Sequence, residues 1–421
     1  MKLIILGGGF GGLKLARLLN NKTDFEITLI DKYNYHQFQP LFYQVATAGL
    51  DASNISFPLR KVFQKSNNIR FRMDEIKSIN TTLNQVITNN DIYDYDYLVI
   101  ATGASTNFFG NKNLEEHTFP MKSTIEALQL RYRLIRNFEK ALHSDSEEDL
   151  QYLMNVVIVG GGPTGVELSG AIAEMKKYVL PKDYPELDFT KMNIYLLEGS
   201  PHTLAAMSKK SSEQSLSYLE HLGVTVMTNS HLNDYDGRTL TLKNGMQLQS
   251  ALVIWAAGIK GNVPEGIDPA LLARGNRIRV DKYNRVEGLN NVFAIGDIAY
   301  IEDVAFPHGL PQIASVAIQQ SALLAKNLKR ILSKESLKPF SYKDKGVMAT
   351  VGRNLAVVDI PKPKLHFGGF FAWLVWMGLH LMLILGVKNK FFVFINWLYN
   401  YFTYDQSLRL IFKEDDNFEK K

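Results

Sequence analysis

The chain has 421 residues, of which 46% are hydrophobic and 21% charged, so it is long enough for two or three folded domains. It contains no cysteine, which excludes disulfides, thiolate metal sites, iron–sulfur clusters and electron transfer through a cysteine pair. We therefore expect no metal site. The net charge of +5 is weak support for nucleic-acid binding, and we expect no such partner. No targeting leader precedes the first strand, so we expect the chain to stay in a bacterial cytoplasm.

The first residues, MKLIILGGGFGG, form a short apolar strand followed by the pattern G-x-G-x-x-G at Gly7, Gly9 and Gly12. Helical spacing follows, and a second strand ends in Asp31, nineteen residues beyond Gly12. Glycines at these positions permit a tight turn and bring a pyrophosphate close to a helix N-terminus. The acid can accept hydrogen bonds from an adenosine ribose. This order predicts a dinucleotide site.

The pattern recurs at Gly160, Gly162 and Gly165, and its second strand ends in Glu198. The acid lies thirty-three residues beyond Gly165, and we place the excess in an inserted loop that contains two prolines. Glu198 should repel a 2′-phosphate and thus favour NADH over NADPH.

Two such units imply two dinucleotides, of which one is most simply a flavin. Three further expected strands end in glycine-containing turns, in the order expected of a flavoprotein that binds two dinucleotides. These strand ends are at Thr102-Gly103, Gly258 and Gly296-Asp297. The carboxylate of Asp297 can bind the ribityl hydroxyls of a flavin. A helix is expected after Gly309-Leu310-Pro311, where its dipole could stabilise a reduced flavin and the small Ala314 would allow a flat ring to approach.

At this point the sequence resembles the pyridine nucleotide:disulfide oxidoreductase superfamily. More narrowly, it is similar to the type II NADH dehydrogenases, which are single-chain NADH:quinone oxidoreductases. The likeness extends to about residue 400 and rests on the runs DKYNYHQFQPLFYQVATAGL (31–50), GGGPTGVELSGAIAEM (160–175), VIWAAGIKGN (253–262), VFAIGD (292–297) and LPQIASVAIQQSALLAKNL (310–328).

The resemblance implies noncovalent FAD, NADH as substrate and a quinone as acceptor, without proton pumping. It also implies that Glu167 positions the nicotinamide or delivers a proton, and that Lys345 lines the quinone side. The family's quinone motif A-Q-x-x-x-Q reads ASVAIQ here, so Ser315 replaces the first glutamine beside the retained Gln319. Gln312, one turn earlier on the expected helix, is a partial substitute.

Residues 367–387 are uncharged and apolar, and a second apolar, aromatic run occupies 391–402 after the expected turn VKNK. A quinone acceptor places the enzyme at a lipid surface, so we expect these residues to anchor it on the cytoplasmic face of the inner membrane without crossing. A true span and a buried core helix remain alternatives.

The expected fold is α/β, with two Rossmann-like domains and a C-terminal helical membrane-associating segment. We place the FAD domain at 1–118 and 263–345, the NADH domain at 119–262, and the membrane segment at 346–421. Two other functions stay open: a soluble NADH-dependent ferredoxin or rubredoxin reductase, and a flavoprotein that acts as an NADH sensor or binding partner. Whether the chain forms a homodimer is also open.

Overall fold

The structure is a computed structural model that describes residues 1–412, so the end of the expected membrane segment, residues 413–421, lies outside the described residues. The chain forms two compact units. Unit 1 comprises residues 1–37, 57–105 and 259–344, and unit 2 comprises residues 38–56, 106–258 and 345–421.

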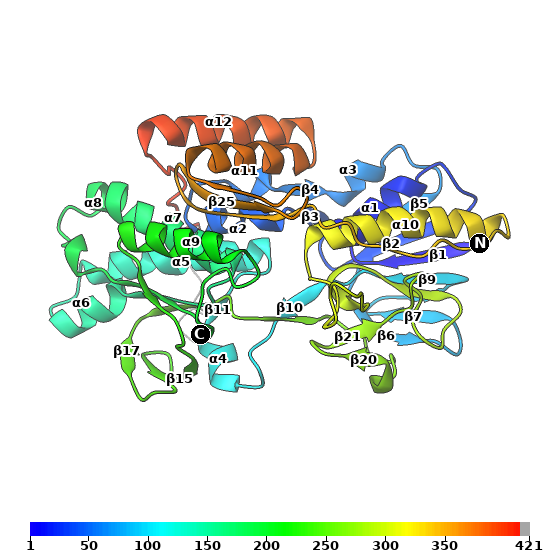
Figure 1. Cartoon of the computed structure of the whole chain (residues 1–421), viewed down its shortest axis with the longest axis horizontal. Helices are drawn as coiled ribbons and strands as arrows, with labels where there is room; N and C mark the ends of the chain where they lie inside the picture. Colours follow the sequence, from blue (N-terminus) through cyan, green and yellow to red (C-terminus); the bar gives the residue numbers. More distant parts are fainter. Residues whose placement is uncertain (413–421) are drawn as a thin grey trace. The chain divides into compact units, whose positions relative to one another are not determined.

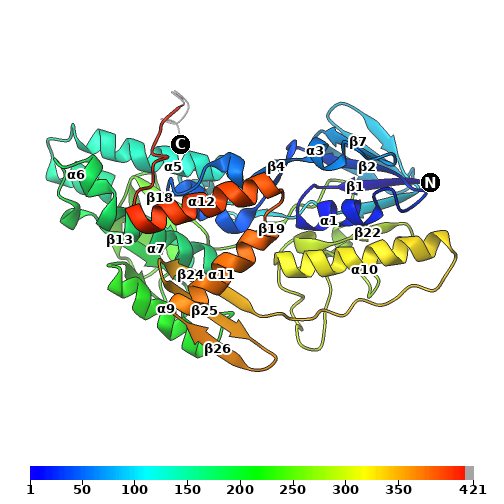
Figure 2. The ribbon, with the colours of Figure 1, turned by 90° about the horizontal axis from the view of Figure 1, so that it is seen from above.

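Unit 1 is built on a five-stranded parallel sheet in the order β22-β9-β1-β2-β5. These strands are β1 (Lys2–Leu6), β2 (Glu26–Asp31), β5 (Ile69–Met73), β9 (Tyr97–Ile100) and β22 (Val292–Ala294). Helix α1 (Phe10–Leu19) lies beside α10 (Ala314–Leu332), as Figures 1 and 2 both show. Ser321 of α10 donates a hydrogen bond to the carbonyl of Gly11, which joins the two helices.

Unit 1 also contains two smaller groups of strands that share a core with this sheet. One antiparallel group contains β6 (Ile76–Asn80), β7 (Gln85–Thr88) and β8 (Ile92–Asp94). A second, mixed group contains β20 (Leu272–Ala273), β21 (Arg277–Arg279) and β23 (Ala299–Tyr300), in which β21 pairs with β20 antiparallel and with β23 parallel. Helix α3 (Leu59–Phe63) packs near β5. Buried aliphatic side chains from the sheet and both groups form one core.

Unit 2 repeats the design, with a five-stranded parallel sheet in the order β11-β18-β12-β13-β14. Its strands are β11 (Phe119–Pro120), β12 (Val156–Val159), β13 (Ile194–Leu197), β14 (Thr225–Met227) and β18 (Leu252–Trp255). The helices are α2 (Phe42–Ala46), α4 (Lys112–His117), α5 (Thr124–Ala141), α6 (Glu147–Met154), α7 (Pro163–Tyr178), α8 (Leu180–Asp183) and α9 (Lys209–His221). An antiparallel group of β15 (Leu232–Tyr235), β16 (Thr239–Leu242) and β17 (Gln247–Gln249) completes it. The expected α/β fold with two Rossmann-like sheets is confirmed.

The expected loop after α7 is partly helical. Pro181 lies within α8 instead of ending all helical structure, because a proline is tolerated in the first turn of a helix, where its missing N–H has no helical partner.

The C-terminal part of unit 2 is a three-stranded antiparallel sheet followed by two helices. The strands are β24 (Val347–Gly352), β25 (Leu355–Ile360) and β26 (Leu365–Gly368), and the helices are α11 (Phe370–Leu383) and α12 (Val387–Thr403). This sheet contacts α9 and α11, and α12 lies beside α11 (Figures 1 and 2). One contact is so close that a Cβ on Gly170 of α7 would lie 1.4 Å from the carbonyl oxygen of Val351, so β24 can lie directly on α7.

The boundary between the two C-terminal helices differs from the expectation. The run VKNK is the first turn of α12 and not a connecting turn. Gly386 has a positive φ of 86° and takes the sharp bend itself, which leaves Val387 to Lys390 helical. Among residues 1–412, no helix is both long enough and apolar enough to cross a membrane.

Candidate functional site

The first glycine turn connects β1 to α1 in unit 1 as the sequence predicts. A Cβ on Gly12 would lie 1.9 Å from the carbonyl oxygen of Gly7, so only glycine allows this approach. Around Gly9, which immediately precedes α1, a Cβ would meet no atom within 4 Å. The N-terminus of α1 therefore opens onto free space, as a pyrophosphate site requires.

Asp31 is placed to complete this turn. Its carboxylate accepts hydrogen bonds from the backbone N–H of Gly8 at 2.6 Å and of Tyr33 at 2.7 Å. Burial raises the pKa of Asp31, and the two backbone donors oppose that rise. The acid is thus held rigidly at the end of β2, beside the glycine turn.

The other residues predicted to bind a flavin are also in unit 1, at the ends of its strands. Thr102 donates to the carbonyl of Asn262 at 2.7 Å, and the carbonyl of Gly103 accepts from the N–H of Asn262. Gly296 has a φ of +76° and donates its N–H to the side chain of Gln320 on α10. Gln320 is 1% exposed and was not predicted, because nothing in its spacing marks it out from other polar helix residues.

The start of α10 provides a second helix N-terminus in unit 1. The helix begins at Ala314, and no side chain among residues 1–412 caps its first N–H groups. These groups can donate to a ligand, and the helix dipole favours negative charge there.

Two of the four residues expected at the quinone, Ser315 and Gln319, are brought together on α10. The Gln319 amide donates to Ser315 at 3.1 Å and to the carbonyl of Lys343, and it accepts from the N–H of Lys343. Its amide therefore holds the segment that follows α10. Lys345 lies just beyond that segment, in unit 2, and is exposed.

We expected Gln312 to lie on α10, one turn before Ser315, and this prediction is wrong. It precedes the helix, and its amide donates to the carbonyl of Asp297 at 2.8 Å. The physical reason is that this bond holds Gln312 in the approach to the helix, which starts only at Ala314.

Unit 2 contains the second glycine turn, between β12 and α7. A Cβ on Gly165 would lie 1.9 Å from the carbonyl oxygen of Gly160, and the space around Gly162 is open. Glu198 accepts from the N–H of Gly161 at 2.5 Å and from Ser200 at 2.7 Å. This is the arrangement of Asp31 in unit 1, and the longer spacing in sequence does not alter it.

Gly258 follows β18 in unit 2. Its carbonyl accepts from the N–H of Asn107 at 3.0 Å, and a Cβ there would lie 2.8 Å from the ring of Phe109. The absence of a side chain at Gly258 thus allows residues 107–109 to pack against the strand end.

Glu167 lies on α7 and lines a cavity of about 110 Å³ in unit 2. Burial raises the pKa of Glu167 to about 8, and the backbone N–H of Thr350 and the nearby indole of Trp376 oppose that rise. The Trp376 Nε1–H faces the carboxyl but makes no hydrogen bond of normal geometry. Glu167 keeps partial exposure, which we attribute to its position on the cavity wall. At neutral pH it therefore holds a proton.

The walls of this cavity come from segments far apart in sequence. Trp376 of α11 lies edge-on to Tyr43 of α2, and Trp397 of α12 donates to Gln44 at 2.7 Å. Asn400 of α12 donates to the carbonyl of Gly49. Residues 38–50 therefore support both C-terminal helices. Sequence reasoning singled out this run but did not predict its partners.

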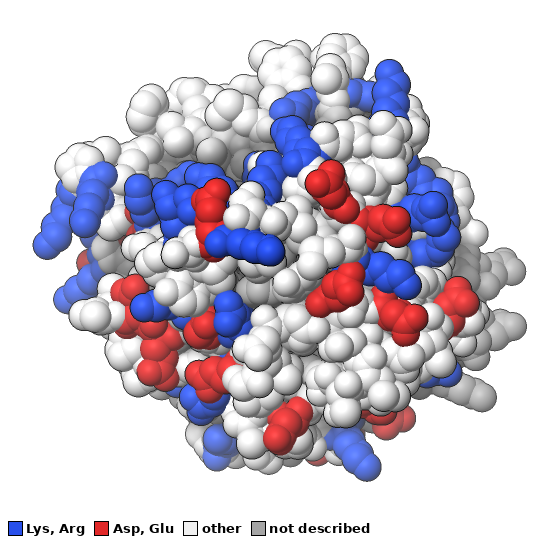
Figure 3. Space-filling model, turned by 90° about the vertical axis from the view of Figure 1, so that its right-hand side faces the viewer, with Lys and Arg blue, Asp and Glu red and all other residues white. Residues whose placement is uncertain are grey.

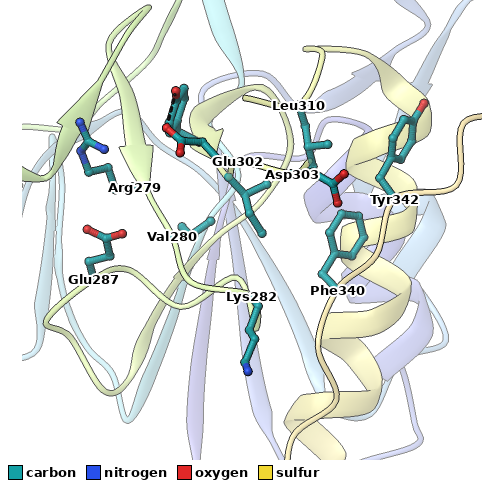
Figure 4. Close-up of a pocket in the computed structure, with 11 residues that line it drawn as sticks. Arg279, Val280, Lys282, Glu287, Glu302, Asp303, Leu310, Phe340 and Tyr342 are labelled. Carbon is teal, nitrogen blue, oxygen red and sulfur yellow. Dashed lines mark hydrogen bonds between the residues drawn. The ribbon is translucent and has the colours of Figure 1, made fainter. Parts of the chain in front are cut away.

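A larger cavity of about 300 Å³ lies in unit 1 (Figure 4). Arg279 and Glu287 lie on one side of it, and Phe340 and Tyr342 on the other. None of the residues predicted from the sequence lines this cavity, and its charges are mixed, so we assign it no role.

Two family models match the chain. Residues 1–321 match the family described as pyridine nucleotide-disulphide oxidoreductase, and residues 345–404 match the NDH2 C-terminal domain. The chain is 34% identical over 415 residues to the type II NADH:quinone oxidoreductase Ndh of Mycobacterium tuberculosis, with 94% of this chain and 87% of that protein covered. The chain belongs to the type II NADH:quinone oxidoreductases.

Other proteins agree with this membership. The type II NADH:quinone oxidoreductase of Staphylococcus aureus is 29% identical, with 83% of this chain and 87% of that protein covered. The structure of NDH2 from Plasmodium falciparum in complex with NADH has a TM-score of 0.88 at 22% identity, covering 96% of this chain and 99% of that one, which shows a shared fold. The predictions of the family and of the enzyme class are confirmed.

Proposed function

We propose that this type II NADH:quinone oxidoreductase holds FAD noncovalently in unit 1, binds NADH in unit 2, and passes two electrons through the flavin to a membrane quinone. The observation that carries the proposal is that each unit has its own glycine turn with an acid fixed beside it, Asp31 in one and Glu198 in the other. The curated relatives are named for reaction between NADH and quinone, which supports the choice of donor and acceptor.

In unit 1 the residues present fit an FAD. The open helix N-terminus at Gly9 and the acid Asp31 suit the adenosine pyrophosphate and ribose, and Asp297 suits the ribityl chain. The uncapped start of α10 suits the oxygen of a flavin ring. When bound, FAD supplies the hydride and electron-transfer chemistry.

In unit 2 the proposed roles are binding and proton supply. Glu198 would accept hydrogen bonds from the ribose diol of NADH, and the turn at Gly162 would receive the pyrophosphate. Glu167 holds a proton that a reduced quinone needs, because a quinone becomes a quinol only with two electrons and two protons. Gly258 would lie against the nicotinamide side of NADH.

We also propose that the quinone site includes Gln312, Ser315, Gln319 and Lys345. The side chains of Gln312 and Gln319 already bond to the backbone, and Ser315 bonds to Gln319 and Tyr342. We therefore assign these three residues to shaping the site and leave Lys345 as the group free to approach a headgroup. The reaction needs only two dinucleotide sites and an acceptor, and we propose that it proceeds without proton pumping. We also propose the domain assignment of 1–118 with 263–345, 119–262 and 346–421.

We further propose that α11 and α12 lie on the lipid surface of the inner membrane, at its cytoplasmic face. Whether the chain forms a homodimer stays open. On α11 only Ala372, Trp376 and His380 are buried, a stripe of spacing four, while the remaining apolar side chains of the helix are partly or largely exposed. An exposed apolar surface of this kind marks a site of contact with lipid or protein. Lys388 and Lys390, in the first turn of α12, suit an anionic lipid headgroup.

Charge elsewhere on the surface is mixed. In the view of Figure 3, basic and acidic side chains are interspersed with neutral ones. A lipid contact for this chain therefore rests on the apolar helices and not on charge alone.

The experiment that tests the proposal separates the two half-reactions. The purified chain should be yellow and release FAD on heating. Under anaerobic conditions NADH should bleach the flavin, and a short-chain quinone should restore its colour. A colourless protein that cannot be reconstituted with FAD would overturn the flavin assignment, and bleaching without restoration by quinone would overturn the acceptor.

A further inference from the structure

A second acid, Glu174, lies on the same face of α7 as Glu167. The two are seven residues apart, which is nearly two helical turns, or about 10 Å along the axis. Both line the cavity of about 110 Å³, and Ala171 lies between them on the same wall. The small side chain of Ala171 leaves the space between the two carboxyls open.

The cavity is large enough and polar enough to hold water. A volume of 110 Å³ accommodates several water molecules. The Oε1 atom of Gln406, which lines the cavity, is buried and has no hydrogen-bond partner among residues 1–412. Buried polar atoms are nearly always paired, so this oxygen indicates that water occupies the cavity.

Each carboxyl is fixed by one backbone donor from the adjoining sheet. The N–H of Thr350 bonds to Glu167, and the N–H of Arg353 bonds to Glu174 at 2.5 Å. A carboxyl group has further acceptor positions, and these remain available to water. The two acids are thus held in place with room for water between them.

The guanidinium of Arg353 is committed to α12. It donates to the carbonyls of Asn400 at 2.7 Å and Tyr401 at 3.0 Å, and it stacks over the ring of Tyr404 at 3.6 Å. Burial raises the pKa of Glu174 even though Arg353 opposes that rise. The other titratable groups on the cavity wall are Tyr43, Tyr401 and Glu167, and none of them is a cation.

The two ends of the cavity differ in how deeply their lining residues are buried. Around Glu167, the side chains of Tyr43, Thr350 and Trp376 are all at most 7% exposed. Around Glu174, Arg353 and Tyr401 are partly exposed. Water therefore reaches the cavity more easily at the end where Glu174 lies.

We propose that Glu174 relays protons from solvent to Glu167 through water in this cavity during quinone reduction. The inference rests on the proposed function. A proton that leaves the carboxyl of Glu167 for an oxygen of the reduced quinone leaves a carboxylate. Water then carries a proton from Glu174 to that carboxylate, and Glu174 takes a proton from solvent in turn. One such cycle supplies the proton that the overall reaction, NADH + H+ + quinone to NAD+ + quinol, takes from solvent, because the hydride of NADH brings the other hydrogen.

The test uses the full-length protein and the substitution Glu174→Gln, which keeps an acceptor for the Arg353 N–H but cannot carry a proton. Glu220→Gln, an exposed acid on α9, is the matched control. Flavin bleaching by NADH, and its reoxidation by ferricyanide, should be unchanged, because ferricyanide accepts electrons without protons. Reoxidation by a short-chain quinone should slow roughly tenfold at about pH 8, less at lower pH, and show a larger solvent deuterium effect.

A second substitution keeps both acids and blocks the space between them. Ala171→Leu should slow the quinone step in the same way, provided that its melting temperature shows a folded protein. An infrared pH titration reads the carboxyls without turnover. Glu174→Gln should remove one buried carboxyl signal and slow the exchange of the Glu167 proton with deuterium.

The outcomes separate the two proposals. If the unmutated enzyme is reoxidised by ferricyanide but by no quinone, the proposed function fails and the relay with it. If quinone is reduced and Glu174→Gln matches Glu220→Gln in rate, pH profile and deuterium effect, the relay alone is wrong. If Glu174→Gln slows ferricyanide and quinone equally, Glu174 has a structural role and the relay is also wrong.

Discussion

Asp31 and Glu198 occupy equivalent positions in the two units, each accepting from the second glycine of its turn and from the residue two beyond itself. Those bonds fix the acid before any nucleotide arrives, so little conformational freedom remains to be lost on binding. We propose that a rigid carboxylate at this point binds a ribose diol and would repel a phosphate in place of one of its hydroxyls.

Glu198→Ala should therefore weaken binding of NADH more than that of NADPH. A hydrogen bond to a charged group contributes about 1.5–3 kcal/mol, so the dissociation constant for NADH should rise about tenfold to a hundredfold. Glu198→Gln, which keeps the acceptor for Gly161, controls for loosening of the turn. Titration of each nucleotide against the protein measures the effect, and equal use of both nucleotides by the unmutated enzyme would contradict the assignment.

Glu167 should lower stability at alkaline pH. Its pKa of about 8 in the folded state lies above the ordinary value of 4.5, so the native state binds this proton more tightly than the unfolded chain does. The stabilisation of the native state by this proton is complete below pH 4.5. It falls by about 1.4 kcal/mol per pH unit as the pH rises from 4.5 to about 8, and it is lost above about pH 8.

Glu167→Gln removes this dependence because an amide does not ionise. The variant should exceed the unmutated protein in free energy of unfolding by a few kcal/mol at about pH 9 and by little at about pH 5. Urea unfolding at the two pH values measures it, with Glu220→Gln as the control. A difference independent of pH would show that Glu167 is ionised in the native state.

Helices α11 and α12 show how an element can be apolar for two reasons at once. Their buried side chains, such as Trp376 and Trp397, pack against residues 38–50, while Phe391 is 59% and Phe402 is 73% exposed. Burial within the unit explains the first set but not the second.

The exposed set should be needed for membrane binding and not for folding. Replacing both Phe391 and Phe402 with Asp should weaken partition into anionic vesicles by at least tenfold, because moving a phenylalanine out of lipid costs about 1.5–3 kcal/mol. Leu83→Asp, at an exposed leucine in unit 1, is the control. Unchanged vesicle binding of the folded double variant would contradict a lipid role for this surface.

The whole chain contains two compact units, and every residue predicted to bind FAD lies in unit 1 while every residue predicted to bind NADH lies in unit 2. A ligand stabilises the native state of the part that binds it. Each dinucleotide should therefore protect one unit in particular.

Hydrogen exchange of the flavin-free protein tests this at the level of peptides. Added FAD should slow exchange mainly in β1, α1 and the start of α10, and added NADH mainly in β12, α7 and β13. At about a hundredfold excess over the dissociation constant, each ligand should contribute about 2.7 kcal/mol to the unit that binds it. Protection of unit 2 by FAD alone would reverse the assignment of the two sites.

The sequence alone predicted both glycine turns and the acids beside them, because strand, glycine turn, helix and acid follow one another within a short stretch of chain and their geometry depends on local sterics. It did not determine where α10 begins, since the bond from Gln312 to Asp297 that delays the helix joins separate segments. Nor did it show that residues 38–50 support α11 and α12, or that Glu167 holds a proton. Only the tertiary structure decided these, because desolvation of a carboxyl depends on which distant side chains pack around it, and the packing partners Tyr43 and Trp376 are separated by more than three hundred residues.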